Sequence, residues 1–567
     1  MPIPRIEPVP TPDPLRVTPA APASSPPLAT ALAYWIALLA LAAIWLATLA
    51  GRSLISADEG RYASISLAML QSGDWITPRL NGLLYFEKPP LQYWAGAASM
   101  ALFGVNEFAA RLWPGLAGLV MVLLPGYTAA RLWGHRAGVR ATLLGLGTTW
   151  IILNSHFLSL DAGLSAALTL VLCGVLLAQA AGTAGQPNTQ ARWMLAAWGG
   201  MGLAIMSKGL IGLLIPGAVL VLHSLWRLDA SIWRRLNWLP GVALLLAITL
   251  PWFIAVSLRN PGFAEFFFIH EHFQRYLSNV HQREGAWWYF VPYLVVGFLP
   301  WTSALPWLLV PRRSDFARSW LWLWAVFIFA FFSASGSKLP SYILPIFPAL
   351  VLLLTRATSA LGQRFSRWHL AVPVLLWACA GIAATQAERF YNADTPQAAI
   401  DALARGLGIG SVLFLVAAAL AWATARKGRL TTALGLVAVA HAAATLIVMA
   451  SHDTFGQLKS SAGIVKALAP QIDAQTPVFS VRSYEQTMPF YLGRSTVLVD
   501  YVDEFAFGET HEATRWIPTL AEFTTRWQRE PRAAAYMGPD TFAELQRMKL
   551  PMRVVFEDSR RIVVVKP

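Results

Sequence analysis

The sequence Ser56-Ala57-Asp58-Glu59-Gly60-Arg61-Tyr62 decides how the rest of this chain is interpreted, together with Tyr85-Phe86-Glu87-Lys88-Pro89-Pro90 a short distance further on. Both stretches lie between the first two of many long apolar segments. Charged side chains at the end of such a segment often do no more than mark the edge of a membrane. Carboxylates, cations and tyrosines gathered this densely favour a second interpretation, which is a site for chemistry at the membrane surface.

The composition is that of a protein with many membrane spans. Of its 567 residues, 56% are hydrophobic and only 13% are charged, and the mean hydropathy is +0.50. The 25 tryptophans fit the aromatic belts of membrane interfaces better than a water-soluble core. Residues 1–29 differ, because their Pro- and Ala-rich start predicts a disordered tail. Cys173 and Cys379 lie in apolar runs without a neighbour at metal-binding or redox spacing, which predicts two small packing residues.

Thirteen apolar segments are predicted to span the membrane, because each approaches the roughly 20 residues that cross a bilayer as a helix. They lie near residues 32–50, 112–130, 138–155, 162–181, 193–207, 209–225, 237–256, 287–310, 319–334, 341–355, 369–385, 407–425 and 431–450. The apolar run 91–104 is too short to span, and we expect it to form an interfacial helix within the outer loop 51–111. The spanning domain is then predicted over residues 30–451.

Basic residues alternate between the loops in the way that sets membrane orientation. Five loops carry clustered positive charge: Arg131, Arg136 and Arg140; Arg227, Arg234 and Arg235; Arg312, Arg313 and Arg318; Arg356, Arg364 and Arg367; Arg426, Lys427 and Arg429. The positive-inside rule places these loops and the N-terminal tail in the cytoplasm, and the C-terminus outside. Because this set accounts for much of the net charge of +14, no nucleic-acid partner is expected.

The chain changes character after residue 451. Strand-like runs at 476–481, 495–502, 533–537, 553–557 and 561–565 alternate with helical patterns at 459–472, 483–492, 519–529 and 540–548. Alternating strands and helices are typical of an α/β fold. The sequence therefore predicts a small α/β domain over residues 452–567, on the outer side of the membrane.

The outer loops collect the ionisable residues that could carry chemistry. The cations are Arg61, Lys88, Lys208, Arg275 and Lys338, and the tyrosines beside them are Tyr62, Tyr85 and Tyr342. Taken singly, each also fits a plainer role, such as a turn residue or a side chain of the interfacial belt. Together on one face, guanidinium, ammonium and phenol groups suit phosphate oxygens. Beside the carboxylates of Asp58 and Asp161, they indicate a lipid-linked phosphosugar.

His270-Glu271-His272 is a weak candidate for metal binding. Histidines two residues apart do not share a helix face, and the zinc-protease spacing HExxH is absent. A partial site in which Glu87 and His270 hold a divalent ion such as Zn²⁺ is a hypothesis, and a solvated surface histidine is the plainer interpretation. The predicted chemistry itself requires no cofactor.

At these residues the chain resembles the bacterial lipid A 4-amino-4-deoxy-L-arabinose transferases, relatives of the protein O-mannosyltransferases in the GT-C class. The resemblance is carried by residues 58–62, 73–75, 78–82, 85–94, Asp161, 207–209, 270–275, 338–342, 484–487 and 499–505. It implies an undecaprenyl-phosphate-linked aminosugar donor and a lipid A phosphate acceptor. It further implies thirteen spans in the bacterial inner membrane, an outer (periplasmic) α/β domain and resistance to polymyxin and other cationic peptides.

The resemblance also suggests roles for the site residues. Lys88, Arg275 and Tyr342 are expected to hold the donor phosphate, with Arg61, Tyr62, Tyr85 and Lys208 in support. Positive charge there stabilises undecaprenyl phosphate as it leaves, and a single displacement inverts the sugar. A lipid A phosphate, with a second pKa of about 6, is already mostly anionic. We therefore expect Asp58, helped by Asp161, to position the acceptor or the sugar amine without acting as a general base.

Two alternative functions stay open on the sequence. One is a GT-C enzyme that uses another polyprenyl-phosphate sugar, or a protein or glycan acceptor. The other is a sugar-lipid transporter, which predicts inverted repeats and ionisable residues within the spans. No internal repeat is evident, and His441 is the exception among spans that otherwise hold almost no ionisable residue away from their ends. An outer-face scaffold protein does not explain cations spread over four loops.

Overall fold

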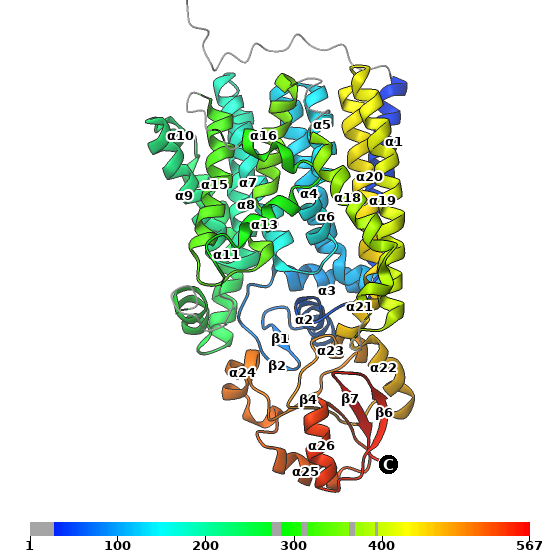
Figure 1. The fold of residues 1–567 in the computed structure, drawn as a ribbon. Helices are drawn as coiled ribbons and strands as arrows, with labels where there is room; N and C mark the ends of the chain where they lie inside the picture. Colours follow the sequence, from blue (N-terminus) through cyan, green and yellow to red (C-terminus); the bar gives the residue numbers. More distant parts are fainter. Residues whose placement is uncertain (1–27, 275–284, 309, 311–314, 362–368, 392–394) are drawn as a thin grey trace, which may run out of the picture.

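A bundle of long helices forms one end of the molecule and a small α/β domain forms the other (Figure 1). The computed structural model describes residues 28–274, 285–308, 310, 315–361, 369–391 and 395–567. The predicted tail, residues 1–29, therefore lies almost wholly outside the described residues. Many bundle helices expose Leu, Ile and Val side chains, as helices that face lipid do. The protein is thus a multi-pass membrane protein with an additional domain at one end of its bundle.

The bundle contains, in chain order, α1 (Leu28–Ala47), α4 (Glu107–Trp133), α5 (His135–Leu146), α6 (Thr149–Ser155), α7 (Leu160–Thr183), α8 (Pro187–Lys208), α9 (Ile211–Arg227), α10 (Ser231–Arg234), α11 (Trp238–Arg259), α13 (Phe290–Gly297), α14 (Leu305–Leu308), α15 (Phe316–Ala334), α16 (Ile346–Leu361), α18 (Ala371–Ala384), α19 (Gln397–Arg426) and α20 (Leu430–Ser451). Each of the thirteen predicted segments falls on one helix or on consecutive helical elements. Within the described residues, seven helices are long and apolar enough to span, or eight if the pair α13–α14, bent by 114°, is one span. The count of thirteen stays a prediction.

The close packing of α7 against α8 depends on small residues. A Cβ added to Gly200 would lie 2.8 Å from the carbonyl oxygen of Ala167, and one on Gly174 would lie 3.0 Å from that of Trp193. Glycine and alanine let helix backbones approach in lipid, where no hydrophobic effect drives them together. The pair is antiparallel, so the start of α7 and the end of α8 lie at the same end of the bundle.

Two surface helices and a hairpin lie between the bundle and the C-terminal domain (Figure 1). They are α2 (Asp58–Ser72), β1 (Arg79–Leu80), β2 (Leu83–Leu84) and α3 (Leu91–Phe103). The short helix expected over residues 91–104 is α3. Asp58 and Glu59 occupy the first turn of α2, where carboxylates interact favourably with the helix dipole.

The C-terminal domain has the predicted α/β fold. Its strands are β3 (Val478–Val481), β4 (Val497–Val499), β5 (Ala534–Met537), β6 (Arg553–Glu557) and β7 (Ile562–Val565), in the sheet order β4-β3-β5-β7-β6. β3 is parallel to β4 and β5, whereas β7 is antiparallel to β5 and β6. Its longer helices are α22 (Ala462–Leu468), α23 (Met488–Leu492), α24 (Ala506–His511), α25 (Leu520–Arg529) and α26 (Pro539–Arg547). Every predicted strand is present, and α24 is an additional helix.

The domain is seated directly on α2, and a glycine permits the contact. A Cβ on Gly60 would lie 2.4 Å from the backbone nitrogen of Thr487, closer than a real Cβ approaches. Ser64, one turn further on, donates a 3.0 Å hydrogen bond to the carbonyl oxygen of Gln486. The glycine that follows the two carboxylates is therefore required by the approach of another backbone.

A fully buried ion pair holds the base of α2. Arg111, near the start of α4, donates to both carboxylate oxygens of Glu59 at 2.6 and 2.8 Å. The remaining guanidinium hydrogen bonds go to the carbonyl oxygens of Leu49, Arg52 and Ser53. Burial by itself raises the pKa of Glu59, but Arg111 outweighs burial and leaves that pKa below its usual value. This carboxylate therefore stays ionised and serves the fold.

Arg111→Met tests the importance of this pair. The substitution leaves the buried Glu59 carboxylate without its cation, which costs about 3–5 kcal/mol. We expect a clear drop in the melting temperature of the purified protein in detergent. Arg482→Met is the matched control, because Arg482 forms exposed ion pairs with Asp500 and Glu544 that contribute about 0–1 kcal/mol. Equal melting temperatures for the two variants would show that the buried pair is dispensable.

Candidate active site

Asp58 and Glu59 are neighbours in sequence but lie in different environments. The Asp58 side chain is 35% exposed and accepts a 2.7 Å hydrogen bond from Arg61, whereas Glu59 is buried against Arg111. Arg61 also donates to Glu504, at 2.5 Å. The guanidinium of Arg61 therefore forms ion pairs with two carboxylates, one on α2 and one in the C-terminal domain, and so joins the two parts.

Glu504 lies in the loop that follows β4 and is almost fully enclosed. Its second oxygen accepts a 3.2 Å hydrogen bond from the side-chain amide of Gln486. Burial raises the pKa of Glu504 above its usual value, and the charge of Arg61 offsets part of that rise. Tyr62 and Tyr85 are buried beside this group, and burial, above all, raises the pKa of both phenols well above the ordinary value. Both tyrosines are therefore neutral hydrogen-bonding groups.

A second cluster forms where α7, α8 and the turn before α16 meet. Asp161, at the start of α7, accepts hydrogen bonds from Lys208, the last residue of α8, and from the Ser341 hydroxyl at 2.7 Å. The Lys208 ammonium also lies 4.2 Å from the centre of the Tyr342 ring. The structure thus brings together three of the predicted site residues that are far apart in sequence.

Lys88 lies in the loop between β2 and α3. Its ammonium donates a 2.7 Å hydrogen bond to the carbonyl oxygen of Glu87 and lies 3.9 Å from the carboxylate of the same residue. Both side chains are mostly buried. Because a proline follows it, Lys88 disfavours helical backbone geometry. Pro89 therefore restricts the backbone conformation of the loop that carries the Lys88 ammonium. Lys338, by contrast, is buried and donates to the carbonyl oxygen of Ser335.

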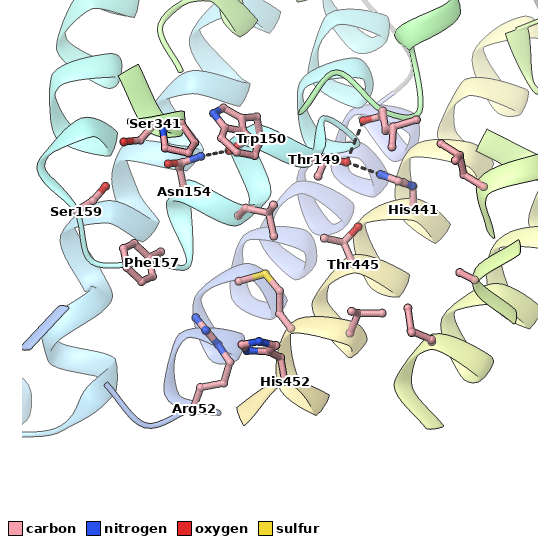
Figure 2. A pocket seen from close by; sticks show the side chains of 18 of the residues that line it. Arg52, Thr149, Trp150, Asn154, Phe157, Ser159, Ser341, His441, Thr445 and His452 are labelled. Carbon is pink, nitrogen blue, oxygen red and sulfur yellow. Dashed lines mark hydrogen bonds between the residues drawn. The ribbon is translucent and has the colours of Figure 1, made fainter. Parts of the chain in front are cut away.

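A cavity of about 700 Å³ connects the interface with the interior of the bundle. Its polar lining includes Arg52, Asp58, Ser159 and Ser341, and the rest is mainly apolar. Figure 2 shows Arg52 beside His452 on one side and Thr149 hydrogen-bonded to His441 on another. Because Asp58 and Ser341 line the same cavity, it is bordered by both polar clusters. Its mainly apolar lining suits the apolar chain of a lipid whose charged group stays at the interface.

Two predicted residues lie outside what the structure describes. Arg275 is not among the described residues, and for His270, in the π-helical turn Glu265–Gln274, only the backbone is described. Among the described side chains, no three of His, Cys, Asp and Glu lie close enough to hold a metal ion. The Glu87–His270 metal site stays a prediction.

Sequence reasoning missed Arg52, Arg111 and Glu504 as parts of this region. Arg111 carried a usable signal, since a cation at the outer end of a predicted span runs against the positive-inside pattern and needs an explanation. Glu504 lies in the stretch 499–505 that carries part of the resemblance, but no local pattern predicts its contact with Arg61, which joins residues 443 positions apart. Arg52, just after the first helical segment, donates to the carbonyl oxygen of His156 at the end of α6, and no local pattern predicts a contact between residues 104 positions apart.

Comparison with known proteins supports the architecture in two parts. Residues 30–267 match the family model described as dolichyl-phosphate-mannose-protein mannosyltransferase. Residues 464–566 match the model described as the aminoarabinose transferase C-terminal domain. Together with the helical bundle, the interfacial helices and the carboxylate on α2, these matches define a protein of the GT-C glycosyltransferase class.

Comparison with a solved structure identifies the family within this class. The crystal structure of ArnT from Cupriavidus metallidurans bound to undecaprenyl phosphate superposes with a TM-score of 0.88 at 37% identity, covering 94% of this chain and 98% of that one. The chain therefore belongs to the aminoarabinose transferase family.

Two curated relatives agree with this family. They are undecaprenyl phosphate-alpha-4-amino-4-deoxy-L-arabinose arabinosyl transferases, 36% identical over 330 residues in Pseudomonas paraeruginosa and 35% over 335 residues in Edwardsiella ictaluri. The matches cover 56% and 57% of this chain, and 58% and 59% of those relatives.

The C-terminal domain holds one more buried carboxylate, Glu509 on α24. Its Oε1 atom has no hydrogen-bond partner among the described residues, and burial raises its pKa to about 7. A carboxyl whose pKa is higher in the folded than in the unfolded protein favours folding at low pH. That contribution is complete below the unfolded pKa and is lost as the pH rises through about 7.

Glu509→Gln should remove this pH dependence. We expect the variant and the wild type to have the same melting temperature at pH 4, below the unfolded pKa of the carboxyl, and the variant to be more stable by on the order of 1–2 kcal/mol at pH 8, where the wild type must ionise a buried group. Thermal unfolding at both pH values measures the effect. Glu557→Gln, on the exposed edge strand β6, should show no such difference. If the variant and the wild type are equally stable at both pH values, the assignment of a raised pKa to Glu509 is wrong.

Proposed function

We propose that this protein transfers 4-amino-4-deoxy-L-arabinose from undecaprenyl phosphate to a phosphate of lipid A. The observation that carries the proposal is the cavity: Arg52, Asp58 and Ser341 line it, and most of its remaining lining is apolar. Family membership supports the sugar and the carrier. The modification lowers the negative charge of lipid A and so weakens the attraction of polymyxin and other cationic peptides.

The C-terminal domain and the site are proposed to face the periplasm. The loops rich in arginine follow the ends of α4, α9, α14, α16 and α19. Figure 1 shows α10, in the loop that follows α9, at the end of the bundle remote from α2 and α3. By the positive-inside rule those ends are cytoplasmic, together with the N-terminus. The inner membrane of a Gram-negative bacterium then presents the site to lipid A on its outer leaflet.

The donor phosphate is proposed to bind between Lys88, Arg275 and Tyr342. As the bond between the sugar and the phosphate breaks, negative charge grows on the leaving undecaprenyl phosphate, and cations in a site of low dielectric stabilise it. Lys208 lies 4.2 Å from the centre of the Tyr342 ring, and this proximity supports a shared role in holding the phosphate. Asp161 accepts hydrogen bonds from Lys208 and Ser341, so its role is to position both groups.

Asp58 is proposed to orient the acceptor. Its carboxylate already accepts a hydrogen bond from Arg61, and a lipid A phosphate needs little deprotonation at neutral pH. The phosphate oxygen attacks the anomeric carbon from the face opposite the leaving group, through an oxocarbenium-like transition state, and inverts that centre. Arg52, on the same cavity wall, supplies positive charge for the acceptor phosphate.

Mass spectrometry of lipid A tests the proposal directly. In cells that lack their own aminoarabinose transferase but make the donor, this chain should add one aminopentose to lipid A and raise polymyxin resistance. Asp58→Asn should abolish both at normal expression, whereas Asp540→Asn, in the exposed first turn of α26, should leave both unchanged. Unmodified lipid A with a labelled protein or glycan would indicate a sister enzyme.

Filling the cavity should block a lipid substrate. Ala380 on α18 lines the cavity, and its neighbour Cys379 is exposed on the outside of the helix. We expect Ala380→Trp to lower the transfer rate of the reconstituted enzyme about tenfold or more, because an indole takes the place of part of a lipid chain. Cys379→Trp should retain the wild-type rate. Full activity of Ala380→Trp at unchanged melting temperature would exclude the cavity from the reaction.

A further inference from the structure

A second groove opens on the outside of the bundle between α5, α19 and α20. It has a volume of about 600 Å³ and shares no lining residue with the cavity that Asp58 lines. Leu413 and Val439 line it and are 38% and 43% exposed, so the groove opens toward the hydrocarbon of the membrane. The space along α19 and α20 is left by small side chains, which belong to Ala417, Gly435, Ala440 and Ala443. The groove therefore suits an apolar chain.

The groove ends in hydroxyl groups where α20 begins. Thr431 and Thr432, in the first turn of α20, both line it. Thr431 accepts a 3.1 Å hydrogen bond from the Nε atom of Arg140 on α5. This end of α20 is the one remote from the C-terminal domain (Figure 1). A guanidinium is thus fixed beside the polar end of an apolar groove, at an end of the bundle where lipid headgroups lie.

Arg140 differs from an ordinary solvated arginine of a cytoplasmic loop. Its side chain is half-buried, and neither Arg140 nor Arg136, one turn earlier on α5, forms an ion pair within the described parts of the chain. Arg356, at the same end of the bundle, pairs with Asp315. Because Thr431 takes up only Nε, the four N–H groups on the two terminal nitrogens of Arg140 are left for a ligand. A cation that is held in place without a carboxylate favours an anionic ligand.

We propose that this groove binds an anionic glycerophospholipid. The lipid phosphate accepts hydrogen bonds from the terminal nitrogens of Arg140 and from the Thr432 hydroxyl, and one acyl chain lies along the small residues of α19 and α20. Arginine matches phosphate oxygens through pairs of parallel hydrogen bonds, and basic pockets between spanning helices bind anionic headgroups in this way.

The same residues select against a zwitterionic headgroup. No Asp or Glu of the described chain lines the groove, so the ammonium of an ethanolamine headgroup finds no carboxylate there. The charge of Arg136, which already acts on Arg140, repels that ammonium. The site lies outside the reaction and does not depend on the proposed function.

Native mass spectrometry of the purified full chain tests the site with two lipids that share their acyl chains. The wild type should bind phosphatidylglycerol about tenfold more tightly than phosphatidylethanolamine, the effect of a charged hydrogen bond. Arg140→Gln should remove that preference, whereas Lys427→Gln, which deletes an exposed cation in the loop before α20, should keep it. Ala443→Leu fills the groove and should weaken both lipids, unlike Ala423→Leu on an exposed face of α19.

The wild type also provides a measurement that needs no variant. A ligand that binds only the folded protein stabilises it, so phosphatidylglycerol should raise the melting temperature in detergent more than phosphatidylethanolamine does. Equal effects and equal affinities of the two lipids refute the site, as does an Arg140→Gln variant that keeps the preference. A dimer that excludes lipid shows that a second copy of the chain occupies the groove, and refutes it too. Because sugar transfer is not among the readouts, failure here leaves the proposed function intact.

Discussion

The buried ion pair between Glu59 and Arg111 is the constraint on which the site depends. It ties the first turn of α2 to the start of α4 and, through the carbonyl oxygens that Arg111 binds, to the end of the first helical segment. Glu59 also accepts a hydrogen bond from the backbone of Leu158, just before α7. A buried pair costs much desolvation free energy and adds little net stability. Its evident role is to fix where these segments meet, and the position of Asp58 follows from it.

Two adjacent carboxylates therefore perform different tasks, and the sequence alone could not assign them. Asp58 and Glu59 look equivalent in a charged stretch after an apolar segment. The alternation of loop charge and the strand-helix pattern were enough to predict the bundle and the α/β domain, because both rest on local periodicity. The positions of Asp161, Lys208 and Tyr342 within a cluster could not be predicted, since contacts between remote helices leave no local pattern.

The C-terminal domain is part of the site as well as an appendage to the bundle. Its backbone at Thr487 lies so close to α2 that only a glycine fits at position 60, and its Glu504 shares Arg61 with Asp58. These two contacts come from separate loops, so the domain is fixed on α2 in both position and orientation. A mannosyltransferase-like core and an added domain thus meet at Asp58, the carboxylate proposed to orient the acceptor, so the domain is in a position to influence the choice of substrate.

Three cations of the proposed phosphate site are each paired with carboxylates. Lys208 is held by Asp161, Lys88 lies beside Glu87, and Arg61 lies between two carboxylates. Unpaired cations at a membrane interface would capture the abundant anionic headgroups around them. A lipid phosphate must instead compete with carboxylates already in place, so binding needs the right sugar or the right lipid chain as well as charge. In the proposed function, selectivity for one carrier among many anionic lipids then follows from pairing Lys208, Lys88 and Arg61 with carboxylates in advance.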